Sequence, residues 1–504
     1  MSTSILDLFR QAIARDPAAP CITWQGITST YGQVDEGARA VAAGLRAWGL
    51  QPGERVALAM ENSREFVLAY LGAGLAGGVA VPINTQYRAG ELRHILTDSG
   101  AALALANGPA LPEILALRPD LPDFRAVVAV NDTAPDALRW DDINASPIDL
   151  PLPAPSSLAL LVYTSGTTGR AKGVMLSHTN LAANSLAVTQ AWGWTAADRL
   201  LLMLPLFHVH GLGVGLHGTL VTGASLDLRP RFEPHVALAA LATGEYSLFF
   251  GVPTMYSRLL AAAQESDARP RDVRLFVSGS APLSPTVFEA VQREFGQTIL
   301  ERYGMTETGM LTTNPLAGPR RAGTVGKPFP GQEALVGAPG RPLPAGEVGD
   351  VWVRGSNVCQ GYWRNPAATA AAFQDGWFNT GDRGFLDEDG VLTLVGRAKE
   401  LIITGGFNVY PREVEDTLAE HPAVAEAAVF GLPDADLGER VAAAVVLRPD
   451  LDPAGQPDAD DLAEYCRARL APYKKPRQVF FVASLPRNAM GKVQKDALRR
   501  QFED

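Results

Sequence analysis

The sequence predicts an α/β protein with a large N-terminal domain and a small α+β domain at its C-terminal end. The large domain is expected to hold two helix-covered, mainly parallel sheets and a β-rich subdomain. Three observations predict this. The chain has 504 residues, 47% of them hydrophobic, which is enough for more than one core. Short apolar runs bounded by Gly, Pro and Ser alternate with helical patterns over the first 300 residues. The pattern of apolar runs and turn residues then changes near 319 and again near 400.

The first part of the chain repeats a helix–strand rhythm. Apolar residues at helical spacing predict helices over 5–13, 34–48 and 66–76. Short apolar runs predict buried strands at 55–60, 77–83, 102–107, 126–130, 158–164, 200–206, 248–253 and 273–280. The uncharged stretch 200–226 is long enough to span a bilayer. Because it contains Pro205 and five glycines, we expect a buried strand followed by a glycine-rich helix or loop, and no membrane span.

From about 319 the sequence predicts a β-rich subdomain, with short strands and Gly/Pro turns up to 397. The last hundred residues alternate a helix at 412–421 with strands at 424–431, 441–447 and 479–483. The predicted division is an N-terminal domain over 1–396, a hinge over 397–400 and a C-terminal domain over 401–504.

Charge and cysteine content exclude several classes of protein. There are 44 Lys and Arg against 54 Asp and Glu, a net charge of −10 with no basic block. Such a chain is a poor non-specific partner for nucleic acid or an anionic membrane. Its three cysteines form neither a disulfide framework nor a zinc ligand set. The sequence therefore favours a cytoplasmic protein, and it leaves monomer and homodimer open.

The segment Tyr163–Gly173 has the composition of a phosphate-binding loop. It follows a predicted strand and is rich in Ser, Thr and Gly, with one lysine, Lys172. Glycines allow close backbone approach, N–H groups and hydroxyls donate to phosphate oxygens, and the lysine neutralises charge. It is not a Walker A motif, because the Gly-Lys-Ser/Thr ending is missing. The alternative is a flexible surface turn.

Two further patterns lead elsewhere. Gly213–Gly218 matches the GxGxxG dinucleotide fingerprint, but it lies in mid-chain, with Asp227 too close to serve as the ribose-binding acid and Arg229, Pro230 and Arg231 beyond it. It leaves an NAD-dependent oxidoreductase as an alternative from another class. Strand spacing would place His208 and His210 on one face as a metal pair, yet no third ligand is near in sequence. Packing or substrate contact is the favoured role.

Several motifs in order resemble the adenylate-forming superfamily, which includes the acyl-CoA synthetases. Besides Tyr163–Gly173, the strings that carry the resemblance are LPLFHVHG (204–211), VSGSAP (277–282), ERYGMTE (301–307), WFNTGD (377–382), GRAKE (396–400), TGGFNVYP (404–411) and PRNAMGK (486–492). The resemblance implies that ATP activates a carboxylic acid as an acyl-adenylate, releasing pyrophosphate, before coenzyme A takes the acyl group. A non-catalytic nucleotide-binding protein is the alternative that would release no pyrophosphate.

The resemblance also implies roles for individual residues. Lys492 matches the catalytic lysine that bridges the carboxylate and the α-phosphate. Glu307, helped by Thr164, matches the Mg²⁺ contact, and Asp382 matches the ribose anchor. Without the motifs, Lys492 would be an exposed lysine and Asp382 a turn residue. The expected ATP and AMP contacts are Thr164, Ser165, Gly166, Thr167, Thr168, Gly169, Lys172, Ser280, Ala281, Pro282, Glu301, Tyr303, Gly304, Met305, Thr306, Asp382 and Arg397.

For the second half-reaction, the resemblance implies that the small domain is mobile and rotates about Lys399, which carries Lys492 away. Gly405, Gly406 and Phe407 would then line the channel for the pantetheine arm. Because no carrier domain follows, we expect free coenzyme A as the thiol donor, and carrier proteins acting in trans remain an alternative.

Two arginines bear on the choice of acid. Arg258 lies early on a predicted helix, and Arg302 lies beside Tyr303. Arginines at these positions resemble the malonyl-CoA synthetase branch, where they hold the distal carboxylate, and His208 is grouped with them. A buried second carboxylate needs such partners. The expected substrate is malonate or methylmalonate. The alternatives are a short- or medium-chain monocarboxylic acid, with Arg258 facing solvent or paired with Glu265, and Arg302 in a structural ion pair.

Overall fold

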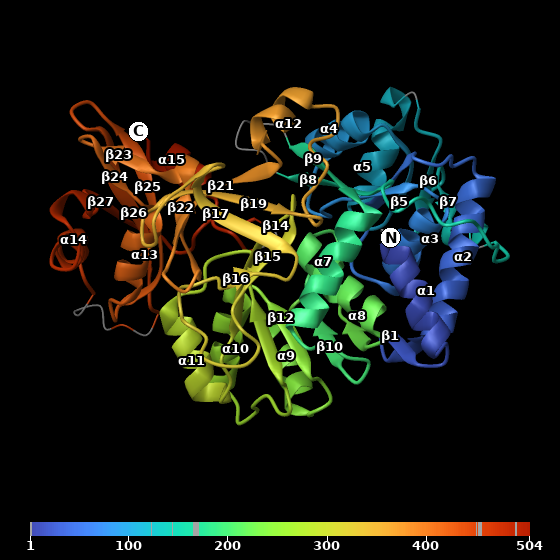
Figure 1. Ribbon diagram of the computed structural model, residues 1–504, viewed down its shortest axis with the longest axis horizontal. Helices are drawn as coiled ribbons and strands as arrows, with labels where there is room; N and C mark the ends of the chain where they lie inside the picture. Colours follow the sequence, from blue (N-terminus) through green and yellow to red (C-terminus); the bar gives the residue numbers. More distant parts are fainter. Residues whose placement is uncertain are drawn as a thin grey trace.

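Figure 1 presents the computed structural model of the chain, which describes residues 3–121, 123–143, 145–164, 171–449, 451, 456–488 and 491–503. Among these residues, the strands form two mainly parallel sheets, a third sheet in the β-rich region and a fourth sheet near the C-terminus. The predicted α/β fold class is confirmed.

The first parallel sheet has its strands in the order β7 (Leu138–Arg139), β6 (Ala126–Ala129), β5 (Ala101–Ala106), β3 (Arg55–Ala59), β4 (Val79–Pro82), β8 (Leu158–Thr164) and β9 (Lys172–Ser177). All pairs are parallel except β8–β9, which is antiparallel. β4 and β5 are buried along their whole length, as expected of strands covered on both faces. The helices of this part are α2 (Tyr31–Ala47), α3 (Arg64–Leu75), α4 (Ala89–Ser99), α5 (Ala110–Leu117) and α6 (Trp140–Ile143).

The second sheet has the order β16 (Lys327–Pro328), β15 (Gly309–Thr313), β14 (Leu300–Met305), β13 (Leu275–Ser278), β12 (Leu248–Gly251), β10 (Arg199–Leu202), β11 (Ser225–Leu228), β1 (Pro20–Trp24) and β2 (Ile27–Thr30). Its helices are α1 (Ile5–Arg15), α7 (His178–Ala191), α8 (His217–Thr222), α9 (Pro234–Ala242), α10 (Pro253–Gln264) and α11 (Pro285–Phe295). One continuous apolar core joins both parallel sheets, with Val56 and Leu160 from the first and Leu200 and Leu248 from the second.

The region after β10 differs from the expectation in one respect. The strand ends at Leu202, before Pro205, and a π-helix runs over His210–Leu216. His208 and His210 therefore do not share a strand face, because the chain has already turned at Pro205, which cannot donate to a sheet. No helix within the described ranges is long and apolar enough to cross a membrane.

The third sheet contains β18 (Arg341–Pro342), β17 (Gln332–Ala338), β19 (Gly349–Gly355), β21 (Trp377–Leu386) and β20 (Phe373–Gln374), with β22 (Leu392–Arg397) beside β21 and α12 (Pro366–Ala372) before β20. The fourth contains β24 (Phe407–Val409), β23 (Ile402–Thr404), β26 (Gly438–Leu447) and β25 (Val424–Asp434), with β27 (Gln478–Phe481) beside β26. Its helices are α13 (Pro411–Ala419), α14 (Ala459–Arg467) and α15 (Lys495–Phe502). In Figure 1 this last unit lies at the left end, opposite the first parallel sheet. The exact domain boundaries stay a prediction.

Candidate active site

The predicted phosphate loop joins two paired strands. Tyr163 pairs with Gly173 and Thr164 with Lys172, so the two ends of the loop leave one antiparallel hairpin. The predicted contacts Ser165, Gly166, Thr167, Thr168 and Gly169 lie outside the described residues. The Lys172 ammonium lies 5.3 Å from the centre of the Tyr362 ring, within range of a cation–π contact.

A buried carboxylate, Asp382, lies on β21 at the centre of the predicted nucleotide site. The Arg397 Nε atom lies 2.7 Å from Asp382 Oδ1, and the Tyr303 hydroxyl donates to Oδ2. Burial raises the pKa of Asp382, while the charge of Arg397 and the bond from Tyr303 oppose that rise. Asp382 is a strand residue and not the turn residue of the simpler interpretation. The structure thus joins Tyr303 to Asp382, which lies 79 residues later and pairs with Arg397 on the neighbouring strand.

Glu307 follows β14 and is buried beside this centre. The Tyr362 hydroxyl donates to Glu307 Oε1 at 3.1 Å. Burial raises the pKa of Glu307, and the bond from Tyr362 and the charge of Arg397 partly oppose it. Tyr362 therefore contacts both Lys172 and Glu307, although no motif pointed to it.

The two strings expected to enclose the adenine lie on neighbouring parallel strands. Ser278 on β13 pairs with Glu301 on β14, so the residues that follow leave the same edge of the sheet. Glu301 is buried; its Oε1 accepts from the Leu283 N–H at 3.1 Å, and its Oε2 has no partner in the described part of the chain. Burial raises the pKa of Glu301 to about 7, against the opposing charge of Arg412. The other residues of these strings are Ser280, Ala281, Pro282, Gly304, Met305 and Thr306.

Arg302 is a buried cation with no counter-charge among the residues that the structure describes. Its side chain is enclosed, with 2% exposure of the residue, and neither Nε nor Nη2 has a hydrogen-bond partner among the described residues. Burial lowers the pKa of Arg302 to about 9. Among the residues that the structure describes, Arg302 forms no ion pair, which contradicts the structural-ion-pair alternative.

His208 and His210 lie beside Arg302, and the three side chains form one polar cluster. Burial and the charge of Arg302 lower the pKa of His208 to about 4 and that of His210 far below its ordinary value, so both imidazoles are neutral at pH 7. His210 Nδ1 lies 3.3 Å from the Ser280 hydroxyl, and its Nε2 lacks a partner within the described residues. The cluster thus holds one guanidinium and two neutral rings and offers hydrogen-bond donors to an anion.

Arg258, the second arginine of the predicted pair, lies on α10. It is exposed, and no described group pairs with it. Glu265, its alternative partner, lies 3.3 Å from His235 instead. Arg258 is one helical turn beyond Thr254, whose hydroxyl would lie 2.9 Å from a Cβ atom placed on Gly491. The described residues show no contact between Arg258 and Arg302, and the same face of α10 carries Thr254 toward the segment that precedes Lys492.

Lys492 lies on the Asp382 side of the site. Its backbone N–H donates to Asn488 Oδ1 at 3.0 Å, in a small hairpin where Arg487 bridges to Val493. The side chain is solvent-accessible, but partial loss of hydration and the charge of Arg397 lower the pKa of Lys492, against the pull of the Glu400 and Asp382 carboxylates.

The residue predicted for the hinge comes two positions after Arg397, and the residues predicted for coenzyme A come a few positions later. Lys399 is in a short 3-10 turn, Ala398–Glu400. Gly405 and Gly406 both have positive φ, which favours glycine in the turn before Phe407. The Phe407 ring is exposed and stacks on Tyr473 with ring centres 4.7 Å apart.

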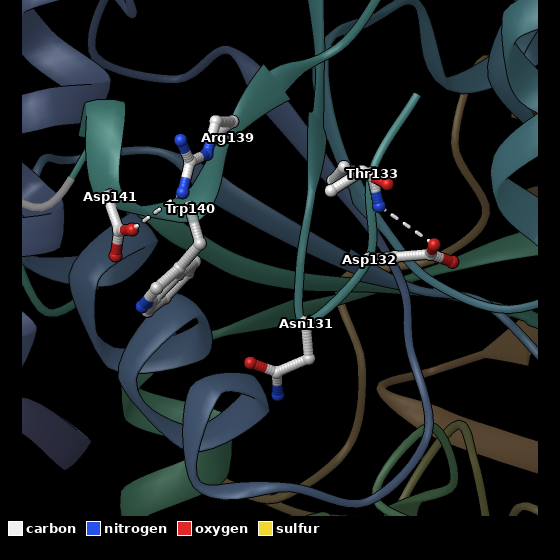
Figure 2. Close-up of a pocket in the computed structure, with 7 residues that line it drawn as sticks. Asn131, Asp132, Thr133, Arg139, Trp140 and Asp141 are labelled. Carbon is white, nitrogen blue, oxygen red and sulfur yellow. Dashed lines mark hydrogen bonds and ion pairs between the residues drawn. The ribbon is translucent and has the colours of Figure 1, made fainter. Parts of the chain in front are cut away.

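A separate hollow of about 490 Å³ lies at the ends of β6 and β7, far from these motifs in sequence (Figure 2). Arg139 and Asp141 form an exposed ion pair at 3.4 Å there, and Asp132 accepts from the Thr133 N–H. Exposed charges that pair with one another contribute little binding energy, so we assign this hollow no chemistry.

Comparison with known proteins agrees with the motifs. The family model described as AMP-binding enzyme matches residues 9–363, and the model of the AMP-binding enzyme C-terminal domain matches 413–492. The chain is 37% identical to a feruloyl-CoA synthase of Amycolatopsis sp, covering 96% of both chains. It is 35% identical to a malonate–CoA ligase of Arabidopsis thaliana, covering 91% of this chain and 79% of that relative.

A crystal structure of ATP-bound MatB from Rhodopseudomonas palustris superimposes with a TM-score of 0.90 at 38% identity, covering 100% of this chain and 99% of that chain. The family models match most of the chain, and each of these relatives exceeds 30% identity over more than two thirds of its own length. The chain therefore belongs to the AMP-binding enzyme family and is an AMP-forming acyl-CoA ligase.

Proposed function

We propose that this ligase acts in the cytoplasm and converts malonate, and close C-substituted malonates such as methylmalonate, to the CoA thioester. The observation that carries the proposal is the buried Arg302 guanidinium, which has no counter-charge among the described residues. A buried cation is stabilised when an anion pairs with it and is costly when it stays unpaired. An acid with a second, distal anionic group supplies that partner.

A monocarboxylic acid fits the cluster less well. Its alkyl tail would leave the guanidinium unpaired in a site from which water has been removed. The relatives do not decide between the two, because they include a feruloyl-CoA synthase as well as a malonate–CoA ligase. The proposal therefore rests on the charge of Arg302 and on the neutral donors His208 and His210 beside it.

In the adenylation step, the attacking carboxylate and the α-phosphate are both anions. We assign Lys492 to neutralise their repulsion, since its ammonium interacts with the Asp382 side of the site. Asp382 would accept from the ribose hydroxyls, with its position fixed by Arg397 and Tyr303. Lys172 and the predicted loop would hold the β- and γ-phosphates.

Mg²⁺ fits this donor set as an ion carried mainly by the nucleotide. Within the described residues no group of three or more His, Cys, Asp or Glu could hold a metal alone. One buried carboxylate, Glu307, and the Thr164 hydroxyl are hard oxygen donors of the kind that complement phosphate-bound Mg²⁺. When bound, the ion would neutralise charge on the phosphates.

For thioester formation we assign coenzyme A as the thiol donor. Rotation of residues 401–504 about Lys399, in the 397–400 hinge, would withdraw Lys492 from residues 1–396. The turn at Gly405 and Gly406 lacks side chains and would admit the pantetheine arm beside Phe407.

Pyrophosphate release tests the proposal. Malonate, methylmalonate, sulfoacetate, acetate, butyrate and octanoate are assayed with and without coenzyme A. We expect malonate to exceed butyrate in kcat/KM by at least about 10²-fold, because a site built for a polar group rejects the analogue that lacks it. Arg302→Ala should remove that preference, whereas Arg293→Ala, an exposed control, should keep it. Equal turnover of malonate and the monocarboxylic acids would refute the proposal.

A further inference from the structure

One face of α4 contacts both ends of the hairpin that carries the predicted phosphate loop. His94 and Asp98 are four residues apart on this helix, so their side chains lie on the same face. The motifs of the adenylating site do not include either residue, and both lie more than sixty residues before the loop in sequence.

His94 contacts a residue on each side of the predicted loop. Its Nε2 atom lies 2.8 Å from the Ala171 carbonyl oxygen, which leads into β9. Since a carbonyl oxygen can only accept, Nε2 carries the proton and donates it. The same imidazole meets the ring of Tyr163, near the end of β8, edge to face at 6.1 Å and 84°.

Asp98, one helical turn after His94, contacts the Tyr163 side chain. Its Oδ2 atom accepts from the Tyr163 hydroxyl at 2.6 Å. Its main-chain carbonyl accepts from the Trp363 indole N–H at 3.0 Å. The Trp363 backbone N–H in turn donates to the Gly173 carbonyl at 2.7 Å, so the β9 side is also tied to this helix.

These contacts lie next to the residues proposed to bind phosphate. Tyr163 precedes Thr164, and Ala171 precedes Lys172, so α4 holds the Tyr163 side chain and the Ala171 carbonyl, each one residue away from a proposed phosphate contact. Small displacements of a positioned group can cost a large part of its binding or catalytic effect. The β8–β9 pairing joins the two ends, and the hydrogen bond from a ring that is itself packed against Tyr163 adds a direction for the Ala171 carbonyl.

We infer that His94 and Asp98 are positioning residues that orient the two ends of the phosphate loop, at Tyr163 and at the Ala171 carbonyl, for ATP. The inference rests on the proposed ATP-binding role of the loop, and it adds residues from α4 to that site. His94 acts through the Ala171 carbonyl and does not touch the nucleotide.

Binding of Mg²⁺ and α,β-methylene-ATP, which resists cleavage at the α–β bond, tests this by titration calorimetry on the full chain without any acid. We expect His94→Ala to weaken binding about fivefold to tenfold, the effect of one lost hydrogen bond with a half-buried partner. Gln places an N–H donor near the position of Nε2, so His94→Gln should recover to within about twofold, whereas the shorter Asn should not. Arg93→Ala, an exposed residue of the same helix, is the matched control.

In turnover assays, His94→Ala should raise the KM for ATP by a similar factor and leave the KM for coenzyme A unchanged. Equal nucleotide binding by His94→Ala and the wild type would overturn the inference alone. Equal losses in the Ala and Gln variants would overturn it too, because packing and not the donated bond would then be responsible. If the wild type does not bind the nucleotide at all, the proposed function fails and the inference with it.

Discussion

Gly279→Ala tests whether Arg302 recognises the distal anion of the acid. Gly279 has no side chain, and the Arg302 guanidinium occupies the space beside it. A Cβ atom at Gly279 would lie 2.4 Å from Arg302 Cζ, 2.6 Å from Nε and 2.7 Å from Nη1. Gly279 does not have a positive φ, so alanine fits the backbone there. The substitution therefore acts on the guanidinium and not on the chain.

The size of the effect follows from these distances. To restore an ordinary contact of 3.4 Å, the guanidinium must move by about 1 Å. A misplacement of about 1 Å in a group that holds a substrate can cost about 10²-fold. We therefore expect kcat/KM for malonate to fall by about 10²-fold, while kcat/KM for butyrate, which offers Arg302 no anion, changes by less than about threefold.

Steady-state pyrophosphate release with both acids measures this ratio. Gly90→Ala is the matched control, since a Cβ there meets no atom within 4 Å. Thermal unfolding of each variant separates a local shift from loss of fold. An unchanged malonate-to-butyrate ratio in a folded Gly279→Ala protein would refute the assignment of Arg302 to the distal anion.

Two other predictions concern acid stability and the catalytic lysine. His178 and His217 are buried and neutral, with burial lowering their pKa from 6.5 to about 4 and about 3, so unfolding makes them take up protons below pH 6.5. Their stabilisation is present above pH 6.5 and is lost as the pH falls; each should cost about 2 kcal/mol by about pH 5. Urea unfolding measures this, and a His178→Gln/His217→Gln variant with the same pH slope as the wild type would contradict it. Lys492→Ala should lower adenylation by about 10²-fold or more, yet keep thioester formation from added malonyl-adenylate; equal loss of both steps would count against the assigned role.

Much of the fold could be predicted from local pattern. Strands buried on both faces have short Val, Leu and Ala runs, so 102–107 and 126–130 match β5 and β6 closely. The failure at His208–His210 has a local cause: an apolar run continues past Leu202, and periodicity does not detect that Pro205 ends the pairing before the histidines.

The candidate site was predictable where its residues lie in motifs, and much less so where they act through space. Asp382, Arg397 and Tyr303 come from separate motifs, and the structure brings them into contact. Tyr362 and His94 belong to no motif, because a tyrosine near Lys172 or a histidine 77 residues before Ala171 has no signature in sequence order. Arg258 shows the converse, a motif-matched residue that the structure leaves exposed.

The burial of Arg302 connects stability with specificity. Its lowered pKa reflects the free-energy cost of enclosing a cation without an anion. Every molecule without substrate carries that cost. An acid with a second anionic group restores the favourable pairing on binding, whereas butyrate, of similar size, restores nothing. The protein's net charge of −10 does not counter this, because exposed carboxylates are screened over about 8 Å at physiological salt while an enclosed pair is not. The pairing of Arg302 with the distal anion is therefore enough to favour an acid that carries one. Raising the salt concentration should weaken the preference for malonate far less than it weakens exposed ion pairs.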